Sequence, residues 1–242
     1  MLCMLTAKSF EGNKETAKIC AVSIELLHIF SLVHDDIMDD DDLRRGKPTN
    51  HKVYGEAVAV LAGDALLALA FEIMGLSKPA GKHNAGDMIH ELALTAGSKH
   101  LVGGQVMDIE GEGAGLSSRE LRFIHASKTA ALLTCSLRLG AMAAGATPRK
   151  LASLSKFGQS AGLAFQVIDD ILDITQSSDK LGKSAGKDLA ADKTTYPALH
   201  GLEKSRREAA RLTANAIAAL KPLGSKASRL HEIAGYLLER DY

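Results

Sequence analysis

Apolar residues recur at intervals of three and four along nearly the whole chain, and this spacing predicts helices. Alanine and leucine dominate, and no segment alternates apolar and polar residues as a half-buried strand does. The pattern predicts helices at about residues 14–38, 56–75, 84–108, 118–143, 148–175, 191–200, 205–220 and 226–239. We therefore expect an all-α fold in which residues 1–242 form a single domain.

Clusters of glycine, proline and polar residues separate the predicted helices. The segment EGEGAGLSS, which precedes the helix at 118–143, also contains a start signal. Ser117 stands three residues before Glu120, and this spacing predicts a capping box in which each side chain satisfies a free backbone N–H group.

The charge balance argues against a nucleic-acid partner. Lysine plus arginine and aspartate plus glutamate number 29 each, so the formal net charge is zero. No overall positive field attracts phosphate backbones, and the absence of tryptophan leaves few side chains for base stacking.

Three cysteines, Cys3, Cys20 and Cys135, are scattered without metal-binding spacing, which favours a reducing compartment. No apolar run reaches the roughly 18 residues of a membrane-spanning helix. The first residues, MLCMLTAKSF, do not have the design of a secretory or transit signal. We therefore expect a cytoplasmic protein without a transmembrane segment.

Two motifs of the same form, DDIMD at 35–39 and DDILD at 169–173, end two mostly apolar helices. Side chains four residues apart lie on the same face of a helix, so each motif presents a pair of carboxylates. Oxygen ligands suit Mg²⁺, and Mn²⁺ equally, and Mg²⁺ often binds a few carboxylates together with substrate phosphates. One acidic cluster is more often a solvated surface, but two copies favour a shared metal–diphosphate site.

Basic residues near both motifs offer partners for phosphate groups. Arg44 and Arg45 follow the first motif, and Lys183 and Lys193 follow the second. Arginine binds phosphate through two parallel hydrogen bonds, and lysine acts as a mobile point charge. Lys128 lies in a helix of small apolar residues, where a lysine needs an anionic partner.

Several blocks together, LVHDDIMDDDDLRRGKPTNHK, LAGDALLALAF, GGQVMDI, SKTAALL, FQVIDDILDI and GKSAGKDLAADKTTYP, resemble the signatures of the trans-isoprenyl diphosphate synthases, the farnesyl and geranylgeranyl type of polyprenyl synthetase. They occur in the family's order over about residues 20–200. The resemblance implies an all-α bundle around a deep apolar cavity, usually as a homodimer. It also implies head-to-tail condensation of isopentenyl diphosphate with an allylic diphosphate.

The resemblance also assigns roles to single residues. It implies three Mg²⁺ ions on the allylic diphosphate, held by the aspartates of the two motifs, Asp35, Asp36, Asp39, Asp169, Asp170 and Asp173, with Asp35, Asp39 and Asp169 the most direct ligands. The other positions that match allylic-diphosphate contacts are Arg44, Lys128, Thr129, Gln166, Lys183 and Lys193. His28 and Arg45 match positions on isopentenyl diphosphate, and Gln105 and Asp108 match a polar pair beside the metals.

In this family, the residues four and five positions before the first aspartate help to set product length. Here they are Ser31 and Phe30. One aromatic residue at the fifth position, with two residues inside the motif, resembles the geranylgeranyl (C20) pattern, whereas two aromatic residues would favour farnesyl (C15). We expect a C20 product, with C15 as the alternative.

One family block, GGKRLRP, is not found in this sequence, which begins with residues that resemble those downstream of that block. We therefore expect the family's first helix to be missing and the binding of isopentenyl diphosphate to be weakened. Other functions are a class I terpene cyclase, a non-catalytic subunit of a synthase, or a plain helical scaffold. A cyclase would have an Asn/Ser/Glu type of second metal motif, whereas this chain has DDILD.

Overall fold

The fold of the chain is all-α, as the sequence predicts. The computed structural model describes residues 1–175 and 193–238. The α-helices of these residues are α1 (Leu2–Ser9), α2 (Lys14–Met38), α3 (Asn50–Tyr54), α4 (Glu56–Gly75), α5 (Ala85–Ala96), α6 (Leu101–Glu110), α7 (Ser118–Ile124), α8 (Ala131–Ala143), α9 (Pro148–Thr175), α12 (Tyr196–His200), α13 (Leu202–Leu220) and α14 (Ser228–Leu238).

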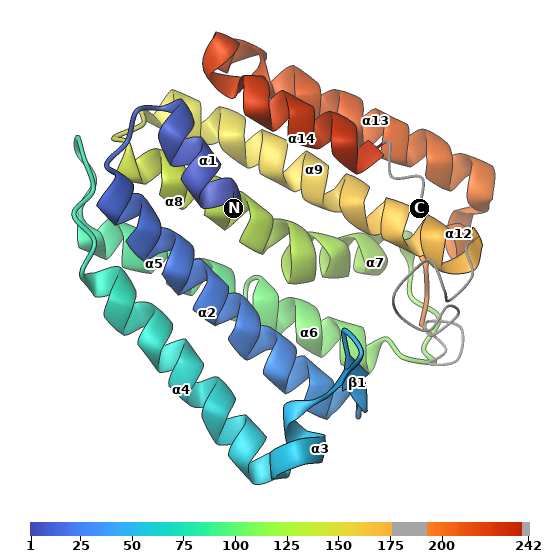
Figure 1. Cartoon of the computed structure of the whole chain (residues 1–242). Helices are drawn as coiled ribbons and strands as arrows, with labels where there is room; N and C mark the ends of the chain where they lie inside the picture. Colours follow the sequence, from blue (N-terminus) through green and yellow to red (C-terminus); the bar gives the residue numbers. More distant parts are fainter. Residues whose placement is uncertain (176–192, 239–242) are drawn as a thin grey trace.

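The helices form a bundle in which α2 and α9 are the two longest elements. Helix α4 packs along α2, and α13 packs along α9, so each long helix has one outer neighbour. Figure 1 shows α4 at one edge of the bundle and α13 with α14 at the opposite edge. The C-terminal ends of α2 and α9, which hold the two aspartate motifs, lie on the same side.

Buried apolar side chains fill the space between these helices. The core includes Leu27 of α2, Met74 of α4, Leu137 of α8 and Phe157 of α9, each at most 1% exposed. Burying one such side chain stabilises a fold by about 1.5–3 kcal/mol. The core therefore provides a rigid frame for the two motif-bearing helices.

Two of the helices expected from the sequence are divided in the structure. The range 84–108 holds α5 and α6, because α5 ends at Ala96 and a turn over 97–100 precedes α6. The range 118–143 contains α7, a π-helical turn at His125–Ala130, and α8. Apolar spacing continues through the π-helical turn and resumes directly after the four residues GSKH, so periodicity alone reveals neither interruption. The capping box at Ser117 and Glu120 is confirmed.

Three short features were not predicted, and one of them is helix α3 at Asn50–Tyr54. Helix α1 lies at Leu2–Ser9, where no helix was expected. After α2, strands β1 (Leu43–Arg44) and β2 (Lys47–Pro48) pair antiparallel and form a hairpin. A two-residue strand is too short to produce an alternating sequence pattern.

Glycines allow close approach of the helices that carry the site. A Cβ atom at Gly162 of α9 would lie 2.5 Å from the Cα and Cβ atoms of Ala130. A Cβ atom at Gly104 of α6 would lie 2.8 Å from the backbone nitrogen of Lys128. Both contacts bring neighbouring helices against the π-helical turn, which holds Lys128 and Thr129.

Among the described residues, α2 and α4 are long and apolar enough to cross a membrane, by length and composition alone. The buried core helix of a soluble protein meets the same criterion, and 44% of the relevant window of α2 is buried inside the fold. For α4 the share is 22%. The absence of a transmembrane segment therefore stays a prediction.

Replacing Gly162 with valine tests the close approach of α9 to the π-helical turn. The added atoms overlap Ala130, so we expect Gly162→Val to lower the free energy of unfolding by about 1–3 kcal/mol. Gly235→Ala in α14 is the matched control, because no atom lies within 4 Å of the added Cβ. It should be neutral or stabilising by up to about 1 kcal/mol. Urea unfolding midpoints measure both, and an unchanged midpoint for Gly162→Val contradicts the packing.

Candidate active site

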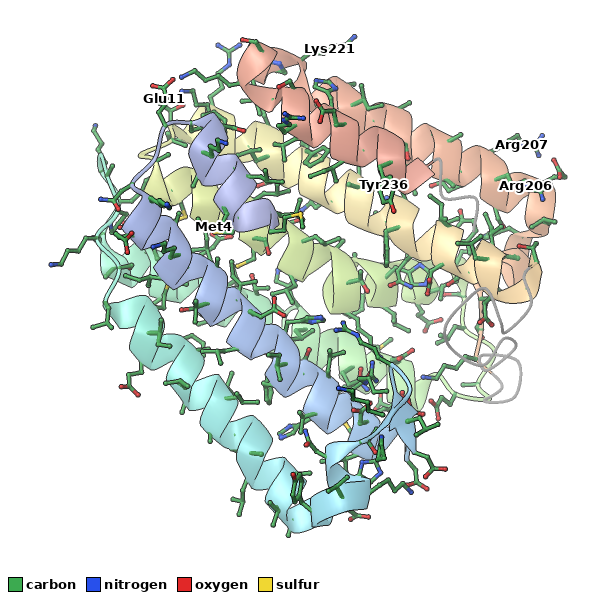
Figure 2. The ribbon with its side chains drawn as sticks, in the orientation of Figure 1. Met4, Glu11, Arg206, Arg207, Lys221 and Tyr236 are labelled. Atoms are coloured by element: carbon green, nitrogen blue, oxygen red, sulfur yellow. The ribbon has the colours of Figure 1, made fainter. Side chains whose placement is uncertain are left out.

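A cavity of about 840 Å³ runs beside α2. A stripe of α2 residues spaced three and four apart lines one wall, namely Ala21, Ile24, His28, Ser31 and Asp35. Residues of α1, α6, α8 and α14 line the other walls, among them Val102, Leu132 and Tyr236. Tyr236, labelled in Figure 2, extends from α14, which packs on α9. The lining is mostly apolar, with Asp35 and Lys128 among its few charged residues.

Lys128 joins the first aspartate motif to α6. Its Nζ atom lies 2.8 Å from Oδ2 of Asp108 and 3.1 Å from Oδ1 of Asp35. Burial alone would lower the pKa of Lys128, but these two carboxylates raise it overall. The lysine is therefore charged and neutralises part of the acidic cluster. A π-helical turn such as the one that holds Lys128 often marks a functional position.

Lys193 forms a second cationic link. Its Nζ atom lies 3.7 Å from Oδ2 of Asp39, 3.7 Å from Oδ2 of Asp108 and 3.4 Å from Oε1 of Glu112. These carboxylates raise its pKa, against the effect of burial. Burial, followed by the charge of Asp35, raises the pKa of Asp39. Sequence reasoning missed Glu112, which lies in the turn after α6, where helical periodicity gives no signal.

The middle aspartates of the two motifs bond to the protein itself. Asp36 is 5% exposed and accepts a hydrogen bond from Nε of Arg44. Asp170 is 6% exposed and accepts a 2.8 Å hydrogen bond from the backbone N–H of Tyr196, where α12 begins. Asp36 therefore holds Arg44, and Asp170 holds the segment that follows Lys193. The sequence pattern contains no sign of this difference within each motif.

The outer aspartates of the second motif lie on one face of α9. Asp169 is half-buried, and its charge acts on the buried His125. Burial lowers the pKa of His125 to about 4, so this histidine is neutral near pH 7. Asp173 is 4% exposed, and its Oδ2 atom has no hydrogen-bond partner among the described residues. An unpaired buried carboxylate oxygen is costly unless a cation binds it.

Arg44 and His28 lie on either side of the first motif in the sequence, and both are polar neighbours of the site. The Nη2 atom of Arg44 lies 3.7 Å from Oδ2 of Asp35, beside the bond from Arg44 to Asp36. His28 lines the cavity, and burial lowers its pKa. The positive charges of Arg45 and Arg44 act in the same direction, so both arginines lie within electrostatic range of His28.

Two amide side chains complete the polar part of the site. Oγ1 of Thr129 donates a 2.6 Å hydrogen bond to Oε1 of Gln166, which links the π-helical turn to α9. Gln105 lines the cavity, and its Nε2 atom is buried without a hydrogen-bond partner among the described residues. That N–H group is free to bind an acceptor on a ligand. Lys183 lies outside the described residues.

Ser31 and Phe30 both line the cavity but differ in direction. Four residues correspond to about 400° of helical rotation, so Ser31 lies about 40° from Asp35 and about 6 Å along the axis. Five residues turn Phe30 about 140° away from Asp35. Its ring is 8% exposed and packs edge-on against His34, with 4.8 Å between centroids. The role of Phe30 in product length stays a prediction.

The donor set fits Mg²⁺ rather than a closed metal centre. Within the described part of the chain, no three His, Cys, Asp or Glu side chains gather closely enough to form a metal site by themselves. Mg²⁺ commonly takes one or two carboxylates together with water and substrate phosphates. The motif carboxylates and the unpaired oxygen of Asp173 match this requirement.

The chain matches known proteins along most of its length. Residues 1–232 match the family model described as polyprenyl synthetase. A chloroplastic geranylgeranyl pyrophosphate synthase from Capsicum annuum is 50% identical over 246 residues, which cover 100% of this chain and 67% of that relative. That relative is named as chloroplastic, whereas we expected a cytoplasmic protein, and the location of this chain stays a prediction.

Solved structures agree with this match. The geranylgeranyl pyrophosphate synthetase of Pyrococcus horikoshii has a TM-score of 0.90 and 29% identity, covering 99% of this chain and 85% of its own. The geranyltransferase of Helicobacter pylori, complexed with magnesium and isoprenyl diphosphate, has a TM-score of 0.81 and 34% identity. The match covers 97% of this chain and 82% of that protein. Together with the family match, these likenesses show that the chain belongs to the polyprenyl synthetase family of prenyltransferases.

Proposed function

We propose that this prenyltransferase condenses isopentenyl diphosphate with an allylic diphosphate and releases geranylgeranyl diphosphate (C20). Farnesyl diphosphate (C15) is the alternative product. The observation that carries the proposal is the cavity of about 840 Å³, which is mostly apolar and has Asp35 and Lys128 in its lining. Such a cavity suits a hydrocarbon chain with a charged head group, and the Capsicum annuum relative is named for the C20 product.

The basic residues bind and orient the allylic diphosphate. Lys128, Lys193 and Arg44 already face the motif carboxylates, so they can shift to phosphate oxygens without moving far. Thr129 and Gln166 hold each other and support the same side of the site. These charges stabilise the negative charge that develops as the carbon–oxygen bond breaks.

Magnesium would supply further positive charge on the leaving diphosphate and so lower the barrier to its departure. We propose three ions, held by Asp35, Asp39, Asp169 and Asp173 from the two motifs. Asp36 and Asp170 support these ligands through Arg44 and through α12. The Helicobacter pylori geranyltransferase, which is complexed with magnesium, is consistent with this choice of metal.

The apolar walls protect the allylic cation that ionisation leaves. Water in contact with this cation would capture it, so Leu132, Val106 and their neighbours in the lining keep the reacting carbon dry. The double bond of isopentenyl diphosphate, which His28 and Arg45 would hold, attacks the cation. The new carbon–carbon bond forms, a proton leaves, and the released diphosphate is its acceptor.

Incubation with Mg²⁺, labelled isopentenyl diphosphate and an allylic primer tests the function directly. Wild type should form a labelled prenyl diphosphate, identified by chromatography. Asp35→Ala and Asp169→Ala should each reduce turnover by at least about a thousandfold, because each removes charge stabilisation from the transition state. Glu203→Ala, on the exposed surface of α13, is the control and should behave as wild type. Near-normal turnover in either aspartate variant contradicts the two-motif site, and a cyclic hydrocarbon product would indicate a terpene cyclase.

Product length can be tested at Ser31. Because Ser31 lies one turn below Asp35 on the cavity wall, a ring at this position blocks the path of the growing chain. Ser31→Phe should shift the product from C20 toward C15 or shorter, with turnover of the shortest primer retained. Val22→Phe, on the exposed side of α2, is the control. An unchanged product spectrum for Ser31→Phe would exclude this residue from length control.

We propose that the chain works as a homodimer through α4. Large apolar side chains are unusually exposed there, including Val58 at 53% and Leu61 at 66%. Asp64, whose side chain is 60% exposed near the middle of the same helix, argues against contact with lipid. A second copy of α4 would cover the apolar side chains, while Asp64 keeps its contact with Nε2 of His34, 3.9 Å away.

Leu61→Glu tests this interface. A carboxylate in the centre of an apolar contact loses hydration without gaining a partner, so we expect dissociation to monomers. Light scattering coupled to size-exclusion chromatography measures the mass. Leu76→Glu, equally exposed but at the end of α4, is the control and should affect assembly less. A wild-type protein that is monomeric at micromolar concentration contradicts the proposal.

We further propose a plastid as the working compartment. The support is the word chloroplastic in the names of the relatives from Capsicum annuum and Catharanthus roseus, both 50% identical to this chain. The three buried cysteines are free thiols in the structure, which is consistent with a reducing compartment.

A further inference from the structure

The hairpin after α2 holds an arginine in an unusual backbone conformation. Strands β1 and β2 pair Leu43 with Pro48 and Arg44 with Lys47. The turn between them consists of Arg45, with a φ of 54°, and Gly46, with a φ of 75°. Two positive φ angles are typical of a type I′ turn, whose first position favours asparagine, aspartate or glycine. Arginine is disfavoured there, so the position of Arg45 must be maintained by the rest of the structure.

Two residues that follow the hairpin in the sequence, Thr49 and Lys52, hold its base through polar contacts. Thr49 is 2% exposed, and its Oγ1 donates a 2.6 Å hydrogen bond to the carbonyl oxygen of Asp41. Its backbone N–H donates a 3.0 Å bond to the carbonyl oxygen of Asp42. Lys52 extends the contact, because its Nζ lies 2.7 Å from Oδ1 of Asp40 and 3.0 Å from Oδ1 of Asp42.

The two arginines of the hairpin depend on this base to different degrees. Arg44 has its own anchor, the hydrogen bond to the buried Asp36. Arg45 is exposed, and within residues 1–175 and 193–238 no ion pair or hydrogen bond fixes its side chain. The placement of Arg45 therefore follows from the turn, and the turn follows from its base.

We propose that Thr49 is a positioning residue that holds Arg45 for the diphosphate of isopentenyl diphosphate, with Lys52 as a second support. This inference rests on the proposed function. It explains why threonine is buried at a position where its only side-chain hydrogen bonds within the described residues go to the backbone of the aspartate run. It also predicts that a change at Thr49 weakens the binding of isopentenyl diphosphate more than that of the allylic diphosphate. Arg44, on the allylic side, keeps its hydrogen bond to Asp36 when the base of the hairpin is disrupted.

Steady-state kinetics of Thr49→Val, Thr49→Ser and Lys52→Met test the proposal. Thr49→Val keeps the shape but removes the hydroxyl, so the KM for isopentenyl diphosphate should rise on the order of fivefold, the equivalent of one lost hydrogen bond. The KM for the allylic diphosphate should stay within about twofold of wild type. Thr49→Ser should restore the wild-type value, and Lys52→Met should change the same KM in the same direction.

Thr213→Val is the matched control. Thr213 is 3% exposed in α13 and also bonds to a backbone carbonyl, that of Ala209, but lies far from the hairpin in the sequence. It should lower the unfolding temperature as Thr49→Val does, without changing the ratio of the two KM values. A ratio that is unchanged in Thr49→Val, or that Thr49→Ser does not restore, overturns the proposal.

The experiment separates this inference from the proposed function. Absence of turnover in wild type refutes the function, and calorimetric titration with isopentenyl diphosphate then decides the inference alone. Binding that is weaker in Thr49→Val than in wild type and Thr49→Ser supports it. Equal binding in all three proteins overturns it.

Discussion

The ammonium group of Lys128, shared between Asp35 and Asp108, is the interaction on which the site depends. The carboxylates of Asp35 in α2 and Asp108 in α6 both contact this ammonium group, and they would repel each other without a cation between them. The glycine at position 104 allows α6 to approach the backbone of Lys128, and the π-helical turn directs this residue into the cavity. The site is therefore held together by charge as much as by the apolar core.

Lysines in this arrangement offset part of the negative charge of the carboxylates, and we propose that they bind phosphate groups of the substrate. Lys193 forms ion pairs with Asp39 and Glu112, as Lys128 does with Asp35. In the proposed reaction, Mg²⁺ would bind these carboxylates and the lysines would then be available to phosphate oxygens. The lysines therefore reduce the repulsion among the carboxylates in this structure.

Most of the fold follows from apolar spacing, because α2, α4 and α9 are uninterrupted amphipathic or buried helices with clear ends. The predicted range 148–175 coincides with α9, whereas 84–108 and 118–143 contain a turn and a π-helical segment that keep the same apolar spacing. The paired aspartates were visible as a repeat. The different contacts of Asp36 and Asp170 were not visible in the sequence. They depend on Arg44 and on the backbone N–H of Tyr196, which only folding brings near these aspartates. Thr49 likewise carried no signal, since a buried threonine looks like any other residue of a loop.

Along the stripe of α2 residues that lines the cavity, the charged groups and the apolar wall lie at different positions. In the proposed reaction, the groups that assist departure of the diphosphate lie at the C-terminal end of the helix. The wall that would meet the growing hydrocarbon lies one or more turns earlier, at Ser31, Ile24 and Ala21. A substitution in the wall leaves the charges of Asp35 and Lys128 unchanged. Natural variation can therefore alter what such a protein makes without first losing the ability to make anything, and new products can arise by single steps.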